Sequence, residues 1–265
     1  MKTLAALTAL LLIGLIAAGC GDDDDDSSTA EETEPEGTGT SEEDLHAPER
    51  LTAGYDPQLD PADFVHPIVD PNPYFPLTPG TTWIYEDETE DGVERVEVSV
   101  TDETKEIIGI TATVVLDEVF IDDELAESTF DWFAQDTEGN VWYLGEETAE
   151  YENGEVVSTE GSFEAGADGA HAGIVMLADP QVGDEYLQEF YVGEAEDYAK
   201  VLALGESVDI AFGSFDNCLK TEDVNPLSAG GGVENKYYCP DVGFVLETNV
   251  EDPEGQLELI EIVEE

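Results

Sequence analysis

Short turn-forming pairs that recur between alternating apolar and polar segments constrain the fold of this chain most. Asn153-Gly154 is the strongest pair, because both residues tolerate the positive φ of a type I′ hairpin turn. Asp91-Gly92 and Asp122-Asp123 separate alternating segments in the same way. Consecutive hairpins of this kind predict a mostly β fold, an antiparallel meander that forms a half-open barrel or a curved sheet with little helix.

The segments between the turns are the expected strands. They share a two-residue alternation and are bounded by Gly, Pro, Asn or Asp. The expected strands cover residues 82–85, 93–100, 111–121, 124–133, 140–144, 185–192, 207–212, 217–223, 234–239, 244–250 and 256–262. We also expect a short helix near residues 194–204 as an interruption of this pattern.

The chain carries an extreme excess of acid, with 66 Asp and Glu against 7 Lys and Arg and a formal net charge of -59. Thirteen of the acids lie between Asp22 and Glu49, which leaves 53 acids and five bases from Leu51 onward. Nucleic acid is therefore excluded as a direct partner, because phosphate binding needs a basic patch. An excess that runs through nearly every expected strand favours adaptation to high salt over one local face for a basic partner.

The N-terminus has the layout of an export signal. Lys2 precedes an apolar run over residues 4–16, too short for a comfortable membrane span, and residues 17–19 lead into Cys20. This layout resembles a bacterial lipoprotein signal, in which the Cys is acylated and becomes the first mature residue. The resemblance implies a signal peptide over residues 1–19 and a lipid anchor at Cys20, on the periplasmic or exterior face of the cell envelope. The alternative is plain secretion with Cys20 as an ordinary thiol.

Two segments separate the signal from the expected domain. Residues 20–54 are acidic and contain no Phe, Trp or Tyr, so we expect a disordered tether. Its acidic run over 22–26 is interpreted as a solvated spacer and not as a calcium site, because calcium needs oxygens fixed on a turn. Residues 55–73 are rich in Pro and are expected to form an extended arm, followed by one β domain over 74–265.

A set of short motifs marks the opening and the middle of this domain. The opening reads Tyr74-Phe75-Pro76-Leu77-Thr78-Pro79-Gly80-Thr81-Thr82-Trp83, and further pieces lie at 131–136, 139–143, 151–154, 213–217 and 237–243. Together they resemble a group of uncharacterised bacterial secreted or lipid-anchored β proteins. The resemblance implies a lipoprotein-associated β fold, and it implies no activity and no functional residues. This chain differs from the group at Cys239 and in its acidity.

Aromatic residues recur on the expected strands, and a rigid turn at Pro79-Gly80 delivers the first two of them to one strand face. The set comprises Trp83, Tyr85, Trp132, Trp142 and Tyr143. We expect these side chains to pack in the core, since aromatic residues dominate β cores. In a half-open barrel the same side chains would instead line an apolar groove for a lipid or another hydrophobic small molecule.

The sequence offers little for catalysis, for a cofactor or for a metal site. His46 falls in the tether, His66 precedes a proline, and His171 stands alone in a Gly/Ala loop. No phosphate loop, dinucleotide fingerprint, nucleophile elbow or zinc motif occurs in the chain. We therefore expect a non-catalytic envelope lipoprotein with a binding or scaffolding role. The alternatives are a carrier of an apolar ligand and a hydrolase that uses acidic residues.

Cys218 and Cys239 are the two cysteines left beyond Cys20, and an exported protein meets an oxidising compartment. The breaker-rich segment 225–232 divides two expected strands. Facing residues of an antiparallel hairpin have a constant index sum, and Asn225 with Gly232 has the same sum as Cys218 with Cys239. Because facing residues lie within the reach of a disulfide, we expect the two cysteines to be bonded.

The lipid anchor is tested by replacing the cysteine that would carry it. Because acylation uses the sulfur of Cys20, we expect Cys20→Ala to lose both incorporation of radiolabelled palmitate and partition into detergent. Cys218→Ala is the matched control and should keep the label. Membrane retention of an unlabelled Cys20→Ala protein would contradict a lipid anchor.

Overall fold

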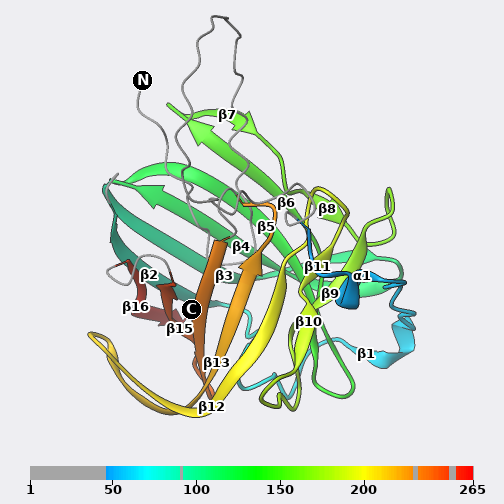
Figure 1. The fold of residues 1–265 in the computed structure, drawn as a ribbon. Helices are drawn as coiled ribbons and strands as arrows, with labels where there is room; N and C mark the ends of the chain where they lie inside the picture. Colours follow the sequence, from blue (N-terminus) through cyan, green and yellow to red (C-terminus); the bar gives the residue numbers. More distant parts are fainter. Residues whose placement is uncertain (1–45, 90–91, 229–231, 251–254, 265) are drawn as a thin grey trace, which may run out of the picture.

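The computed structural model describes residues 46–89, 92–228, 232–250 and 255–264, so the predicted signal peptide and Cys20 lie outside the described residues. The chain forms one large antiparallel sheet that curls into a nearly closed barrel shape with one unsealed seam (Figure 1). Its strand order is β10-β12-β13-β14-β15-β16-β2-β3-β4-β5-β6-β9-β11. The predicted fold class is confirmed.

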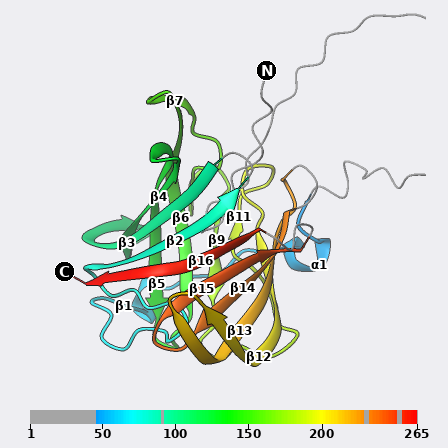
Figure 2. The same ribbon diagram turned by 90° about the vertical axis from the view of Figure 1, so that its left-hand side faces the viewer.

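Two meanders build most of the sheet. The first consists of β2 (Thr81–Thr89), β3 (Gly92–Ile107), β4 (Ile110–Ile121), β5 (Glu124–Asp136) and β6 (Val141–Glu152). The second consists of β12 (Tyr198–Ile210), β13 (Gly213–Asn225), β14 (Gly232–Cys239), β15 (Gly243–Asn249) and β16 (Gln256–Glu264). The last strand, β16, pairs with β2 and joins the two meanders (Figure 2).

Shorter elements complete the structure. On the sheet they are β1 (Phe64–Val65), β7 (Glu155–Ser158), β8 (Phe163–Glu164), β9 (His171–Met176), β10 (Glu185–Leu187) and β11 (Glu189–Phe190). Before the sheet lie a short α-helix, α1 (Glu49–Thr52), and a 3-10 turn, η2 (Pro61–Asp63). No helix in the described part of the chain is long and apolar enough to span a membrane.

The seam of the barrel lies where consecutive residues form both edges of the sheet. β10 pairs with β12, whereas β11 pairs with β9, so the extended chain changes partner at Gln188. Gly173 of β9 permits this crossing, because a Cβ atom there would lie 2.2 Å from the backbone carbonyl of Gln188. A single stretch of chain therefore runs along both sides of the seam.

The turn residues behave as their sequence predicts. Asp122 and Asp123 both have positive φ, at 48° and 66°, and they connect β4 to β5. Asn153 and Gly154 have φ of 53° and 78° and connect β6 to β7. These are the left-handed conformations that a type I′ hairpin turn requires.

The expected helix near 194–204 is wrong. Residues from Tyr198 onward belong to β12, where Ala199 and Val201 are buried and alternate with less buried neighbours. Pairing with β10 on one side and β13 on the other decides the conformation, because it satisfies the backbone on both sides. The expected strand over 207–212 also ends too late, since Ala211 and Phe212 form the turn between β12 and β13.

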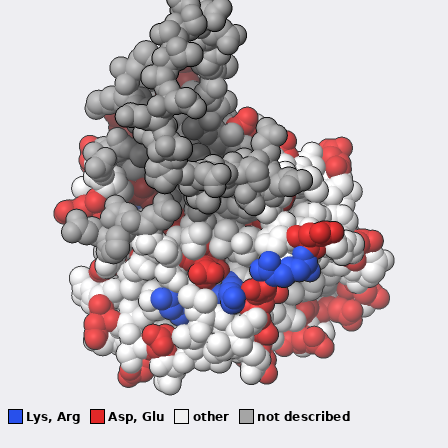
Figure 3. Space-filling view, in the orientation of Figure 1, with Lys and Arg blue, Asp and Glu red and all other residues white. Residues whose placement is uncertain are grey.

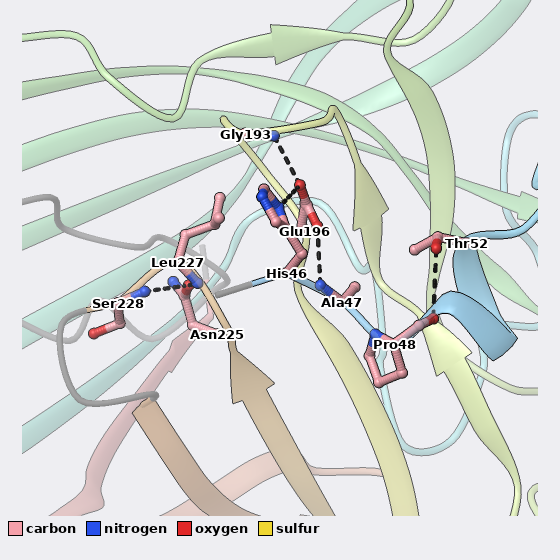
Figure 4. Close-up of polar contacts among 9 residues, drawn as sticks. All are labelled: His46, Ala47, Pro48, Thr52, Gly193, Glu196, Asn225, Leu227 and Ser228. Atoms are coloured by element: carbon pink, nitrogen blue, oxygen red, sulfur yellow. Dashed lines mark hydrogen bonds and ion pairs between the residues drawn. The ribbon is translucent and has the colours of Figure 1, made fainter. Parts of the chain in front are cut away.

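His46 and Ala47, which fall within the predicted tether over 20–54, already contact the barrel. The buried carboxylate of Glu196 accepts hydrogen bonds from the backbone amides of Gly193 at 2.7 Å and Ala47 at 2.9 Å (Figure 4). The Nδ1 atom of His46 lies 2.8 Å from the same carboxylate. This carboxylate holds the segment that leads into α1.

The Pro-rich arm lies on the outer face of β4, β5 and β6. Leu59 and Phe64 pack there against a cluster that includes Trp142, and β1 adds a short pairing to β5. Asn72 then fastens the arm, because its backbone amide donates to the side chain of Gln135 at 2.8 Å. The arm covers the outside of the sheet, and the main hydrophobic core fills the inside.

Candidate functional site

The predicted aromatic residues divide between the two faces of the sheet. Trp83 and Tyr85 line a small apolar cavity of about 50 Å³ inside the barrel, beside Phe244. Tyr143 packs in the same interior core, whereas Trp132 and Trp142 belong to the outer cluster under the arm. The set therefore does not line one groove. A cavity of this volume admits a few water molecules and no lipid chain.

The sulfur atoms of Cys218 and Cys239 form a disulfide, and their Cα atoms lie 4.2 Å apart. The register of β13 and β14 pairs Asn225 with Gly232 and Leu219 with Tyr238. Continuing this register by one residue brings the two cysteines opposite each other, as the index sum predicts. The bond joins the ends of this hairpin inside the core, where both cysteines are buried.

His171, the histidine of the predicted domain, is the first residue of β9, where it pairs with Phe190 of the edge strand β11. Its Nδ1 atom is 3.8 Å from a carboxylate oxygen of Asp56, and its ring packs against Phe190 and Tyr55. The arm thus supplies the partner of this histidine. The contacts around His171 are those of a residue that helps to hold the arm.

Carboxyl groups inside the barrel are the feature that sequence reasoning missed. On β5, Glu127, Thr129 and Asp131 are buried in the same alternation as Phe133, which faces the interior core. Strands on the other side of the barrel repeat this arrangement. The buried acids near the interior are Glu94, Asp117, Glu127, Asp131, Glu146, Glu189, Asp197, Asp223, Glu234 and Glu247.

Lys236 supplies the positive charge of this interior. Its Nζ atom lies 3.8 Å from carboxylate oxygens of both Asp223 and Glu234, and 3.7 Å from one of Glu247. The register places Lys236 between Thr221 of β13 and Glu247 of β15. Burial by itself would lower the pKa of Lys236, but the surrounding carboxylates raise it above its ordinary value, so the ammonium stays charged.

Tyr143 connects two of the acids on the opposite wall. Its hydroxyl oxygen lies 2.5 Å from Oδ1 of Asp131 and 2.6 Å from Oε2 of Glu146. A phenol carries one proton, so it donates to one carboxyl, and the second contact needs a proton on the other carboxyl. Burial raises the pKa of Asp131 to about 7 and that of Glu146 well above its usual range, which keeps such a proton in place.

A β-bulge brings Glu146 into this position. Asp131 pairs with Glu146 and Phe133 with Tyr143, so β6 has one extra residue at this point. Gly145 occupies the bulge with φ of 136°, and a Cβ atom there would lie 2.2 Å from the carbonyl oxygen of Phe163. The bulge lets Tyr143 and Glu146 share one face of the sheet, which regular alternation would forbid.

Several buried carboxylate oxygens have no hydrogen-bond partner among the residues that the structure describes. Both oxygens of Asp117 lack one, and so does one oxygen each of Glu127, Asp131, Glu189 and Glu247. Burial raises the pKa of Glu127 to about 7 and that of Asp197 to about 8. Folding therefore takes up protons above the ordinary carboxyl pKa of about 4, and the stability that each group contributes is lost as pH rises through its folded pKa.

The chemistry of this interior suits protons and small cations. A buried carboxylate without a partner is costly, and a bound positive charge removes that cost. No three His, Cys, Asp or Glu side chains among the residues that the structure describes are grouped to hold a metal ion. The arrangement thus offers diffuse negative charge and no preformed coordination cage.

The described surface is acidic as well. Figure 3 shows acidic residues scattered over the visible face, with basic residues confined to a short row. Two exposed bases share one carboxylate, since Glu185 accepts from Arg50 at 2.8 Å and lies 3.1 Å from Nζ of Lys200. Exposed pairs of this kind add little stability.

Comparisons with known proteins give distant structural similarities and no match to a family. No protein-family model matches the sequence, and no curated protein matches it. A solved structure from Bacteroides fragilis, assigned as an exported protein with a YmcC-like fold, is 14% identical with a TM-score of 0.43, over 71% of this chain and 98% of that one. A structure from Parabacteroides distasonis, assigned as a lipoprotein, is 13% identical with a TM-score of 0.41, over 73% and 99%.

Removing the interior ammonium should destabilise the fold. Lys236→Met keeps much of the side-chain volume but leaves three carboxylates without their cation. We expect the free energy of unfolding to fall by about 3–5 kcal/mol at pH 8, and by less at pH 5, where the carboxyls bind protons instead. Denaturant unfolding at the two pH values measures both effects.

Lys200→Met is the matched control, because Lys200 is partly exposed and pairs with Glu185 at the surface. It should change the free energy of unfolding by at most about 1 kcal/mol at either pH. Equal losses in the two variants, or a loss for Lys236→Met that is the same at both pH values, would argue against a charge role for Lys236.

Proposed function

We propose that this protein is a non-catalytic lipoprotein of the cell envelope, adapted to high salt, whose carboxylate-lined barrel interior binds small cations. The observation that carries the proposal is the set of buried carboxylate oxygens that lack a hydrogen-bond partner in the described part of the chain, with Asp117 foremost because both of its oxygens lack one. Anchoring through Cys20 belongs to the proposal and is tested by the alanine variant.

Adaptation to high salt and cation binding by the buried carboxyls are linked parts of this proposal. Burial raises the pKa of Asp117 well above its usual range, and repulsion from Asp131 and Glu127 raises it further. A small cation that enters replaces the proton and satisfies the oxygens. Because binding to the folded state alone stabilises it by mass action, molar salt would hold such an interior together even where individual affinities are low.

The two alternative functions, a carrier of an apolar ligand and a hydrolase, receive less support. A carrier of an apolar ligand needs a pocket of several hundred Å³, and the interior apolar cavity has about 50 Å³. A hydrolase needs a proton donor and acceptor at a site that substrate can reach. Among the described residues, His171 has one carboxylate partner, Asp56, and the acids at Tyr143 are buried.

The cation proposal predicts that the identity of the cation matters, beyond ionic strength. We expect the thermal midpoint to rise from 10 mM to 1 M NaCl, as the Debye length shortens from about 30 Å to about 3 Å. N-methylglucamine chloride at equal ionic strength screens the surface equally but has a cation too large for the interior. The midpoint should therefore rise less in that salt, as differential scanning calorimetry would show.

Asp117→Asn tests the site directly. It removes the carboxyl group that can exchange its proton for a cation while keeping the shape, so the extra stabilisation by sodium should shrink. Asp209→Asn is the matched control, because Asp209 is exposed on β12, and it should keep the sodium effect. Identical curves in the two salts for the unaltered protein would contradict cation binding, and a flat midpoint in both would contradict salt adaptation.

A further inference from the structure

A hollow of about 360 Å³ opens on the side of the barrel next to β6 and β8, and it is separate from the interior cavity. Trp132 and Phe163 contribute aromatic surface to it, and Tyr191 lines it from the segment after β11. Glu146, which is 2% exposed, also lines it. The hollow therefore combines aromatic rings with a buried, hydrogen-bonded carboxyl group.

The chain places one of its few ammonium groups in this hollow. The Nζ atom of Lys105 lies 3.0 Å from the centroid of the Trp132 ring and 2.8 Å from Oε2 of Glu164. Tryptophan is the aromatic side chain that attracts a cation most strongly. A ring face with a carboxylate beside it is the arrangement that recognises an ammonium ion.

The charge around the hollow favours a cation as well. Lys105 is the one base among the described residues that line it, and the lining acids are Glu146, Glu147, Glu164 and Asp168. The Lys105 side chain is about one-third exposed on a flexible stem, so it can leave the ring for solvent. The ring face would then be open to another cation.

We propose that this hollow binds a small organic ammonium ion, and that Lys105 occupies the ammonium position until the ligand displaces it. The proposal rests on the binding role given above, shares only Glu146 with the buried acids of the interior, and concerns another cation class. Lys105 acts as an internal competitor. Removing it should therefore strengthen binding, which is the opposite of what the loss of an ordinary ligand contact does.

Isothermal titration of the full chain in detergent, with choline as the probe, tests this inference. Choline should bind, whereas 3,3-dimethylbutanol, its neutral analogue of the same shape, should not. Lys105→Gln should tighten choline binding about tenfold, because it frees a cation–π position. Lys200→Gln removes the same charge from another face and should leave the affinity unchanged.

Trp132→Phe is the variant for which the opposite result is expected. It keeps an aromatic side chain in the outer cluster but offers a weaker cation–π face, so choline binding should weaken several-fold. Circular dichroism checks that each variant is folded. If Trp132→Phe does not fold, fluorinated tryptophan is incorporated instead, because it weakens the attraction of the ring face for a cation without changing the shape of the ring.

Equal binding of choline and its neutral analogue, or no gain with Lys105→Gln, would overturn the inference. The sodium-specific rise in thermal midpoint does not depend on the hollow. Failure here with that rise intact refutes the ammonium site alone, and failure of the sodium effect with choline binding intact refutes the interior site alone.

Discussion

A carboxyl group that leaves water must be neutralised, and the interior of this barrel depends on that requirement. On one wall, the register of β13, β14 and β15 brings Lys236 within 3.8 Å of Asp223, Glu234 and Glu247. On the opposite wall, Tyr143 bridges two carboxyls, one of which needs a proton of its own. Other buried oxygens, those of Asp117 above all, have no hydrogen-bond partner among the described residues. Protons and small cations are the charges that can complete this interior.

The fold buries these carboxyl groups through contacts between segments that are distant in the sequence. The arm covers the outer face of β4 to β6 and buries apolar side chains there, so that the sheet is covered on both faces. The bulge at Gly145 turns Glu146 towards Tyr143, and the crossing at Gln188 brings Glu189 to the seam, buried beside Asp197. The bulge and the crossing thus each place an acid that is 2% exposed.

Local patterns were sufficient for the meander, its turns and the register that pairs Cys218 with Cys239. They failed at residues 198–204, where pairing on both sides imposes a strand, and they did not indicate the contact of His46 with the distant carboxylate of Glu196. The buried acids had a readable signal, because Asp117 alternates with Val115 and Val119 on β4. In a chain with 66 acidic residues, this alternation does not distinguish a carboxyl that points into the barrel from one that points out. The bulge and the seam depend on contacts between distant segments, which no local pattern reports.

Infrared spectroscopy of the protein labelled with 13C at the carboxyl groups of Asp and Glu tests the central claim most directly. In low-salt buffer at pH 7, buried carboxyls that hold protons give the carbonyl band of a carboxylic acid, which ionised surface groups do not give. The account predicts that this band is present at pH 7, weakens as the pH rises through about 8, and weakens further when sodium is added at constant pH. A spectrum at pH 7 that contains only ionised carboxylate bands would contradict it.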